Sequence, residues 1–465
     1  MTENPSHPTA GLTTSSHDLP VSPELSRFMA ANWAVSPSPD AGALAPVRAV
    51  TPARRHRLSA RFPGERLVIP AGELKARSND SDYRFRPHSA YAWLTGLTGE
   101  EQAGHVLVLE PAGPHAHEAV LYVRPRSPRV DGNEEFYRDR RYGEFWVGRR
   151  PDLAEAEQLS GIRCAHLDGL SGGRTAPTGR NAATDPELAR ALSELRLVKD
   201  AWEVDQLQLA VDHTTTAFED VVRELPRALS HPRGERWIEG VFNRRARAEG
   251  NGTGYETIAA SGAHACVLHW IRNDGRLNGD ELLLLDGGVE TDSLYTADVT
   301  RTLPLSGRFS PVQRQVYELV LAAQDAGMAA LRPGASFRDF HRAGMRVISE
   351  GLAEWGVLKH AEGDLHRRYT LCSSGHMLGL DVHDCAQARA DAYLDGVLEE
   401  GQVLTVEPGL YLQSDDETLP PELRGIGVRI EDDLVITAEG ARLMSGALPR
   451  TVAGIEEWMG NLLEG

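Results

Sequence analysis

Four carboxylates and one imidazole stand in short, distinctive stretches of the C-terminal half of this 465-residue chain. Hard divalent cations prefer oxygen ligands, and two such ions roughly 3.5–4 Å apart can hold and activate a water for hydrolysis. The candidate ligands are Asp286 in LLLLDGG, Asp298 in TADVTRT, His376 in SSGHMLGLDVHD, Glu407 in LTVEPGLY and Glu431 in GVRIEDD. The pattern predicts a dinuclear metallo-hydrolase.

The combination of these residues is more specific than any one of them. An Asp before Gly-Gly is more often a turn residue, and a lone histidine such as His376 is usually a satisfied polar group. However, Asp286 and Glu407 adjoin strongly apolar segments, where an unpaired carboxylate is costly. Arg429 supplies one compensating charge, and no basic cluster is visible to supply the rest. We therefore expect metal ions to balance the carboxylates.

The stretches around the candidate ligands have the apolar patterns of β-strands. ELLLLDGG is a run of strand length that we expect to stop at a Gly-Gly turn, which places Asp286 at a buried strand end. Side chains alternate along a strand, so Asp298 shares a face with the threonines two residues away on either side. By the same spacing, Asp298, Glu407 and Glu431 are predicted to converge from separate strands of one antiparallel sheet. Such a sheet is a rigid frame for a site.

The whole chain predicts an α/β (α+β) protein of two domains, because 465 residues exceed one ordinary domain. Residues 1–50 are rich in Pro, Ser, Ala and Thr, and we expect a flexible extension there. An N-terminal α/β domain is predicted over 51–190 and a catalytic domain over 195–460. Strand patterns in the first domain occupy 65–72, 103–111 and 117–125.

Three later segments carry helix-capping signals, and we interpret these helices as core packing elements. The signals are Asp200 with Glu203 for a helix within 190–225, Ser310 with Pro311 and Gln313 for a second helix, and Ser336 with Asp339 for a third that runs toward Trp355.

Composition excludes several classes of protein. The net charge of -18 and the lack of a basic stripe argue against a nucleic-acid partner. Mean hydropathy is -0.35, and no apolar run of about 18 residues is present to span a membrane. The first residues lack the basic start and apolar core of a secretory signal, so a cytoplasmic location is expected. Only three lysines occur, among them Lys199, against 46 arginines.

The four cysteines are scattered and form no C-x-x-C pair, so we expect small buried hydrophobic side chains and no disulfide framework. They are Cys164, Cys266, Cys372 and Cys385.

The C-terminal part, about 195–455, resembles the pita-bread metallopeptidases, which include methionine aminopeptidase, prolidase and aminopeptidase P. GHMLGLDVHD, TVEPGLY and GVRIEDD, together with VLHW around His269, are most similar to bacterial aminopeptidase P (Xaa-Pro aminopeptidase). A weaker similarity extends to NDSDYRFRPHSAYAWLTG (79–96) and to the region near FWVGRR (145–150). The resemblance implies an aminopeptidase P-type α/β domain followed by a pita-bread domain with a curved antiparallel sheet. The Asp286–Asp298 connection is about one residue longer than expected for the family.

The resemblance also implies a role for each site residue. Asp286 would bind one metal ion through two oxygens, Asp298 and Glu431 would bridge both ions, and His376 and Glu407 would complete the other site. Mn²⁺ is the expected metal, and Co²⁺ or Zn²⁺ could replace it. The remaining roles are substrate positioning by His269 and His383, support of the ligand carboxylates by Arg429, and a contribution of Tyr411 to that network.

The implied reaction removes the N-terminal residue from peptides that have proline in second position. A hydroxide bridging the metals would attack the first peptide carbonyl, and His269 or His383 would stabilise the oxyanion. Glu407 would take the proton of the water and deliver it to the proline nitrogen.

The nearest alternative is a prolidase, which cleaves only dipeptides and needs a cation for their C-terminal carboxylate. At the position where a prolidase would carry an arginine this chain has Tyr393, although Arg389 is close. Methionine aminopeptidase does not need a large N-terminal domain, and creatinase lacks the metal carboxylates. A metal-free pita-bread binding module is a more distant alternative. Resemblance further implies a homo-oligomer, a dimer or tetramer, in which Arg149 or Arg150 could reach a neighbouring active site.

Overall fold

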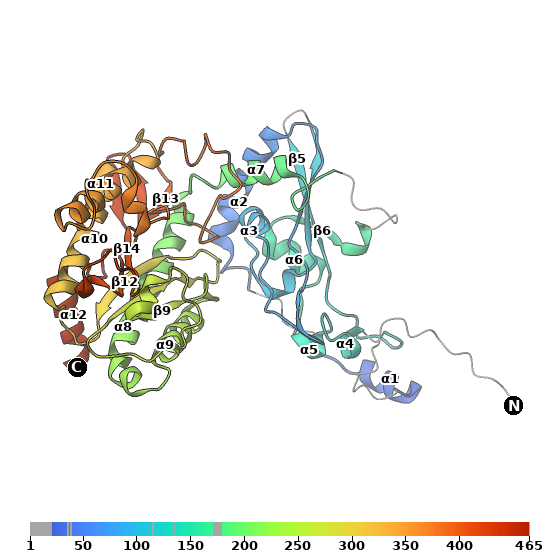
Figure 1. Cartoon of the computed structure of the whole chain (residues 1–465). Helices are drawn as coiled ribbons and strands as arrows, with labels where there is room; N and C mark the ends of the chain where they lie inside the picture. The colour runs from blue at the N-terminus through green and yellow to red at the C-terminus, as the bar shows by residue number, and fades with distance from the viewer. Residues whose placement is uncertain are drawn as a thin grey trace.

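The computed structural model describes residues 21–34, 37, 40–113, 116–133, 135–170 and 179–464. An N-terminal part and a C-terminal part lie side by side (Figure 1). Inside the segment predicted as an extension, the described residues form α1 (Pro23–Ala30) and the first turns of α2 (Ala45–Arg61). Residues 1–20 of that segment lie outside the described residues. The division into domains at 51–190 and 195–460 stays a prediction.

A five-stranded sheet in the order β6-β5-β4-β1-β7 forms the centre of the N-terminal part. β1, β4 and β5 are antiparallel neighbours, and β6 and β7 add in parallel at the two edges. The three central strands fall on the three predicted strand segments. The strands are β1 (Leu67–Pro70), β4 (Val106–Pro111), β5 (His117–Val123), β6 (Arg163–His166) and β7 (Arg180–Asn181), and helices α2, α3 (Ser89–Thr95), α6 (Leu153–Ser160) and α7 (Pro186–Leu195) belong to the same part.

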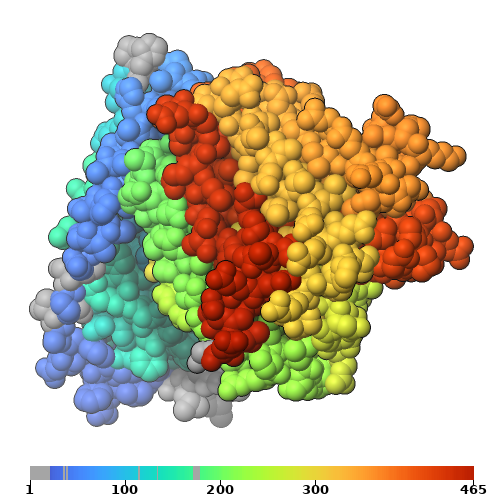
Figure 2. Space-filling view, turned by 90° about the vertical axis from the view of Figure 1, so that its left-hand side faces the viewer, coloured from blue at the N-terminus to red at the C-terminus, as the bar shows by residue number. Residues whose placement is uncertain are grey.

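Helices surround the sheet of the C-terminal part (Figure 1). The predicted capping signals are confirmed, because Asp200 with Glu203 and Ser310 with Gln313 each form a reciprocal capping box. Ser336 and Asp339 accept backbone N–H groups near the start of α11, but its N-cap residue is Phe337, which makes no side-chain cap bond. α12 packs along α8 (Figure 2). The helices are α8 (Ala201–Ser230), α9 (Gly234–Glu249), α10 (Pro311–Ala330), α11 (Arg338–Glu354) and α12 (Val452–Glu464).

The curved antiparallel β-structure of the C-terminal part comprises three main sheets, whereas the sequence predicted that the ligands converge from separate strands of one antiparallel sheet. Their strand orders are β12-β10-β9, β13-β16-β17 and β14-β15. Single backbone bonds join them, such as Glu431 N–H to the Thr300 carbonyl at 3.1 Å. The strands are β9 (Ile258–Ser261), β10 (Leu282–Gly287), β12 (Val299–Pro304), β13 (Val403–Val406), β14 (Gly409–Leu412), β15 (Ile426–Arg429), β16 (Asp432–Thr437) and β17 (Gly440–Leu443).

These divisions coincide with the candidate ligands. Asp298 comes directly before β12, Glu407 directly after β13, and Glu431 between β15 and β16. The strand fixes the direction in which the side chain of a residue at its end points. Because the neighbouring strand does not continue past this residue, its carboxylate is not packed against that strand. The carboxylates of Asp298, Glu407 and Glu431 therefore project into a space between the ends of the strands.

One apolar core connects the two parts. It runs from Leu58 on α2 through Leu207 on α8 to Leu378 and Leu380, which lie between His376 and His383 in the sequence. Among the described residues, no helix is both long enough and apolar enough to cross a membrane. Shorter elements complete the chain: β2 (Ala76–Ser78), β3 (Ser81–Asp82), α4 (Glu135–Arg138), α5 (Glu144–Val147), β8 (Gly252–Thr253) and β11 (Val289–Glu290).

The capping box of α10 leads to a prediction about stability. Ser310 Oγ accepts the N–H of Gln313 at 3.3 Å, and Gln313 Oε1 accepts the N–H of Ser310 at 2.9 Å. Loss of such a cap costs about 1 kcal/mol, so Ser310→Ala should lower the free energy of unfolding by that amount in urea denaturation. Ser230→Ala is the control, because its hydroxyl bonds only to the Arg227 carbonyl at an exposed helix end. Equal losses in both variants would contradict the role of the cap.

Candidate metal centre

Asp286 is the last residue but one of the buried strand β10, and Asp298 precedes its antiparallel neighbour β12. Asp286 pairs with Thr300, so both aspartates project from one face. The expected Gly-Gly turn is wrong, because the chain continues through Gly288 into β11 before it turns. A Cβ on Gly288 would lie 1.7 Å from the carbonyl oxygen of Ala297. Glycine is thus required by the close approach of two backbone segments.

Two hydroxyl groups, to which the sequence analysis assigned no role, hold the carboxylates in place. Tyr255 Oη lies 2.6 Å from Asp286 Oδ1 and 2.5 Å from Asp298 Oδ1. Thr300 Oγ1 donates to Glu431 Oε2 at 2.7 Å. The sequence had placed Thr300 on the same strand face as Asp298, but it did not predict the bond to Glu431. Tyr255 stands in a loop with no pattern that marks it.

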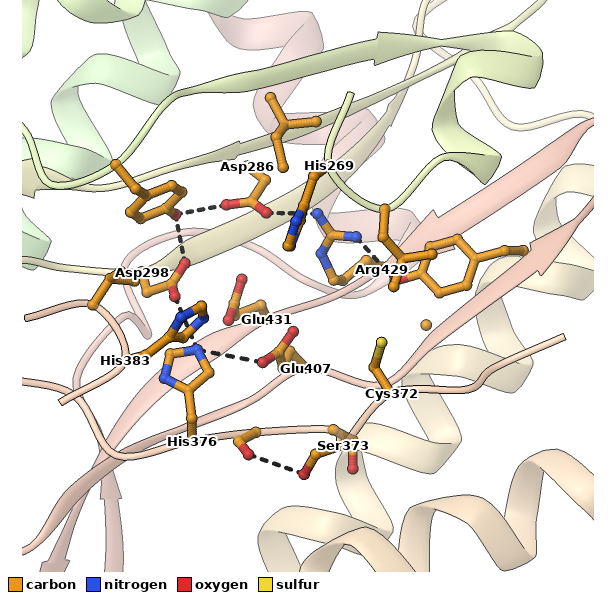
Figure 3. Close-up of a pocket in the computed structure, with 18 of the residues that line it drawn as sticks. His269, Asp286, Asp298, Cys372, Ser373, His376, His383, Glu407, Arg429 and Glu431 are labelled. Atoms are coloured by element: carbon orange, nitrogen blue, oxygen red, sulfur yellow. Dashed lines mark hydrogen bonds and ion pairs between the residues drawn. The ribbon is translucent and has the colours of Figure 1, made fainter. Parts of the chain in front are cut away.

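His376 and Glu407 approach the aspartates from the other side (Figure 3). The backbone N–H of His376 donates to Thr405 Oγ1 at 3.1 Å. The imidazole Nε2 lies 3.2 Å from Asp298 Oδ2 and 3.4 Å from Glu407 Oε1. One ligand atom each of Asp298, His376 and Glu431 lie within 4.8 Å of one another. The structure therefore brings the five predicted ligands into one cluster, in which these three are the most compact group.

The pKa values of the cluster show that it is short of positive charge. Burial, followed by repulsion from Asp298 and Glu407, raises the pKa of Glu431 well above its ordinary value. Burial also raises the pKa of Glu407 to about 7, although His376 opposes the shift. Burial lowers the pKa of His376, but its partners Asp298 and Glu407 outweigh this effect and raise the pKa to about 9. Carboxylates that attract protons this strongly can also bind cations.

Asp433 contributes a further buried carboxylate that the sequence reasoning missed. Its Oδ2 accepts the backbone N–H of Asp298 at 3.1 Å, whereas its Oδ1 is buried with no hydrogen-bond partner in the described part of the chain. Burial, followed by repulsion from Asp298, raises its pKa well above the ordinary value. Its parity with Glu431 on the strand was the available signal. An oxygen-rich set with one imidazole and an unsatisfied buried oxygen fits divalent cations.

Arg429 is buried beside the cluster, and each of its three guanidinium nitrogens makes a contact there. It lies 2.5 Å from Asp286 Oδ2, donates to Thr300 Oγ1 at 3.1 Å and donates to Tyr411 Oη at 2.9 Å. These bonds fix the orientation of Asp286 and supply one positive charge. The predicted supporting roles of Arg429 and Tyr411 agree with this arrangement.

The cluster opens into a pocket of about 480 Å³, in which His269 and His383 are exposed. The rings of His383 and His376 stand perpendicular with their centroids 4.4 Å apart. Partial burial, followed by the charge of His376, lowers the pKa of His383, which favours its neutral form. The apolar wall of the pocket includes Ile258, Leu268, Ile271 and Val382.

Cysteine burial agrees only partly with expectation. All four thiols are free, and Cys266 and Cys385 are buried. Cys164 is half-buried, and Cys372 is exposed in the lining of the pocket (Figure 3). Cys372 lies in the loop before His376, and loops stay at the surface more often than strands do.

Arg149 and Arg150 are engaged within the N-terminal part. Arg149 Nη2 lies 2.5 Å from Glu155 Oε1. Arg150 is buried and donates to the carbonyl oxygen of Pro125 and, at 2.9 Å, to Glu135 Oε1. A contribution of either arginine to a neighbouring active site stays a prediction.

A buried carboxylate and imidazole cluster inside a curved antiparallel sheet defines a metal-dependent hydrolase. The family model described as Metallopeptidase family M24 matches residues 205–438, and the model described as Aminopeptidase P, N-terminal domain matches residues 52–171. The chain belongs to this metallopeptidase family, as the resemblance predicted.

Individual relatives agree with the family assignment. The chain is 52% identical to Xaa-Pro aminopeptidase 1 of Streptomyces coelicolor, over 95% of this chain and 93% of the relative. It is 31% identical to Xaa-Pro aminopeptidase of Escherichia coli, over 85% and 94%. The low-pH form of Escherichia coli aminopeptidase P superposes with a TM-score of 0.76 at 29% identity, covering 90% of this chain and 99% of that structure. Proline aminopeptidase P II of Yersinia pestis gives 0.75 at 29%, covering 89% and 99%.

The crowding of carboxylates leads to a prediction for Glu431→Gln. In the metal-free protein the buried Glu431 must either bind a proton, which its raised pKa makes favourable in the folded state only, or remain charged beside other carboxylates. Glutamine is neutral without this cost, so the variant should raise the melting temperature of the chelator-treated protein above that of chelator-treated parent. Added Mn²⁺ should stabilise the parent by about 2.7 kcal/mol at 100 times its dissociation constant and should stabilise the variant much less. Thermal unfolding with EDTA and with Mn²⁺ measures both effects. Glu400→Ala, at an exposed glutamate, is the control. A parent whose stability does not respond to Mn²⁺ would argue against a metal site.

Proposed function

We propose that this chain is a metal-dependent Xaa-Pro aminopeptidase, which removes the first residue of peptides that have proline in second position. The observation that carries the proposal is the buried ligand cluster in a peptide-sized pocket whose lining also contains His269 and His383. The names of the relatives support the same activity. The large N-terminal part favours this function over that of methionine aminopeptidase, because methionine aminopeptidase does not need such a domain.

Two divalent ions, with Mn²⁺ as the proposed metal and Co²⁺ or Zn²⁺ as substitutes, fit the ligand set. Asp286 would hold one ion, and Asp298 and Glu431 would be shared. His376 and Glu407 would complete the second site. When bound, such ions supply a water of lowered pKa and a Lewis acid for the scissile carbonyl. One solved relative is described as zinc-substituted Escherichia coli aminopeptidase P in complex with product.

The side chains of the pocket carry the proton transfers. Glu407 faces the pocket from the end of β13, and there it accepts the proton of the attacking water and delivers it to the proline nitrogen. His269 or His383 donates a hydrogen bond to the carbonyl oxygen as negative charge develops on it. Proline carries no N–H and its φ is fixed, so a pocket shaped for its ring turns that restriction into specificity.

The charge of the pocket favours an aminopeptidase over a prolidase. A dipeptide presents a carboxylate beside the proline, which requires a free cation, whereas a longer peptide continues as neutral backbone. Among the described residues that line the pocket, Arg429 is the only arginine or lysine, and it is committed to Asp286. Arg389 pairs with Glu194 at 2.8 Å, and Tyr393 accepts a backbone N–H; neither lines the pocket.

We also propose a cytoplasmic homo-oligomer, a dimer or tetramer. Four free cysteines are compatible with a reducing compartment. Exposed aromatic side chains gather on the N-terminal part, where Phe145 packs beside Trp146 and Tyr137, and such a patch is typical of an interface. No nucleic-acid partner is proposed.

Substrate length tests the proposal directly. With Mn²⁺ present, we expect the protein to release alanine from Ala-Pro-Ala and to leave Ala-Pro nearly intact, because the pocket offers no cation to a dipeptide carboxylate. A chelator should abolish the reaction. Product analysis by chromatography measures both rates in parallel. Cleavage of the dipeptide alone would establish a prolidase instead, and silence on both peptides would remove the proposed function.

The proton-transfer role of Glu407 leads to a further prediction. Glu407→Ala should lower kcat for Ala-Pro-Ala by at least about 100-fold while the circular dichroism spectrum changes little and the melting temperature of the chelated protein does not fall. Glu399→Ala serves as the control, because this exposed glutamate lies outside the pocket lining. Near-normal turnover by the Glu407 variant would end its assignment as proton shuttle and ligand.

A further inference from the structure

The segment that carries His383 has two carboxylates for which the proposed reaction has no use. Asp381 lies two residues before His383, and Asp384 follows it directly. Neither side chain lines the pocket that contains the candidate metal ligands. Both bind cationic or hydroxyl partners instead. A function for these carboxylates must therefore be sought in what they bind.

Asp384 is buried between two cations. Its Oδ2 lies 3.0 Å from Lys199 Nζ, and its Oδ1 lies 2.9 Å from Arg196 Nη2. Burial alone would raise the pKa of Asp384, but the charges of Lys199 and Arg196 outweigh it and lower the pKa to about 2. Lys199, one of only three lysines, is itself buried and also donates to the carbonyl oxygen of Arg196. The ion pairs thus fix the residue next to His383.

The chain closes tightly around this carboxylate. The N–H of Asp384 donates to the carbonyl oxygen of Met377 at 2.9 Å, which joins the residue after His376 to the residue after His383. A Cβ on Gly379 would lie 2.1 Å from Asp384 Oδ2, so glycine is needed where the loop passes over the ion pair. Hence Asp384 sets the path of the loop between the two histidines.

Asp381 links the same loop to the N-terminal part. Ser89 Oγ donates to Asp381 Oδ1 at 2.5 Å, and Arg196 Nη2 donates to Asp381 Oδ2 at 3.1 Å. Arg86 donates to the carbonyl oxygen of Leu380, and it also pairs with the buried Glu290 at 2.6 Å. Arg86 and Ser89 both belong to the 79–96 motif, whose role the proposed reaction leaves open.

One guanidinium nitrogen therefore contacts the carboxylates on both sides of His383. We propose that the N-terminal part positions His383 for catalysis through a histidine clamp made of Ser89, Arg196, Lys199, Asp381 and Asp384. The inference rests on the proposed function, in which His383 contacts the substrate. The imidazole of His383 lies beside that of His376, on the wall of the pocket (Figure 3). A misplaced catalytic group costs up to about 100-fold in rate for a displacement of about 1 Å.

Asp381→Ala is the most direct test, because the side chain of Asp381 is 41% exposed and its loss leaves the buried pair of Asp384 intact. With Ala-Pro-Ala and Mn²⁺, kcat should fall about tenfold or more, with unchanged bound manganese and a nearly unchanged melting temperature. Asp381→Asn should recover part of the activity, because it can still accept the bond from Ser89. Asp395→Ala removes a comparable exposed ion pair with Arg338 outside this loop and should have no effect.

The same variant in a His383→Ala background separates positioning of His383 from other effects. If Asp381 acts through His383, Asp381→Ala should cost less than about twofold there, since coupled residues are not additive. Equal losses in both backgrounds would overturn the proposal.

Hydrogen exchange gives a readout that needs no substrate. Amides of residues 379–384 should exchange faster in Asp381→Ala than in the parent or in Asp395→Ala, with and without Mn²⁺. Unchanged exchange would overturn the clamp even if the enzyme is active. A parent that fails to cleave Ala-Pro-Ala would instead overturn the proposed function, and exchange would still decide whether the clamp holds the loop.

Discussion

Repulsion among buried carboxylates is the constraint on which this structure depends. Asp286, Asp298, Glu407 and Glu431 project into one space with limited access to water, and Asp433 adds a further carboxylate behind them. Arg429 offsets only part of the negative charge. Carboxylates held this close either bind protons, as the raised pKa of Glu431 shows, or bind cations. The use of metal ions by this metallopeptidase family corresponds to the binding of cations.

The β-strands hold the crowded carboxylates in place because the candidate ligands lie at the ends of paired strands. Asp298, Glu407 and Glu431 each lie at the end of a strand or between two strands, so backbone pairing holds their positions while their carboxylates stay free. Hydroxyl groups of Tyr255, Thr300 and Thr405 approach the same carboxylates from neighbouring strands and loops. Preorganisation of this kind requires a rigid frame, and antiparallel strands covered by helices provide it.

The N-terminal part contacts the loop between His376 and His383 through apolar and charged side chains. The shared core reaches Leu378 and Leu380, and Ser89 bonds to Asp381 directly. Arg196, between α7 and α8, contacts carboxylates on both sides of His383. Buried ion pairs contribute little net stability, but Arg196 restricts the geometry of the loop because one of its nitrogens contacts both carboxylates. The linkage explains why a domain outside the ligand cluster can influence the position of a pocket histidine.

The sequence by itself determined the family, the ligand candidates and the long helices α8, α10 and α11, because strand alternation, apolar runs and capping residues act over a few neighbouring positions. It misread the Gly-Gly pair at Gly288 as a turn, since only the backbone of Ala297 opposite reveals the need for glycine. Tyr255 and the partners of Asp381 and Asp384 came from the tertiary structure alone. Those contacts join residues far apart in the chain, and short-range patterns carry no record of which distant side chain lies across a fold.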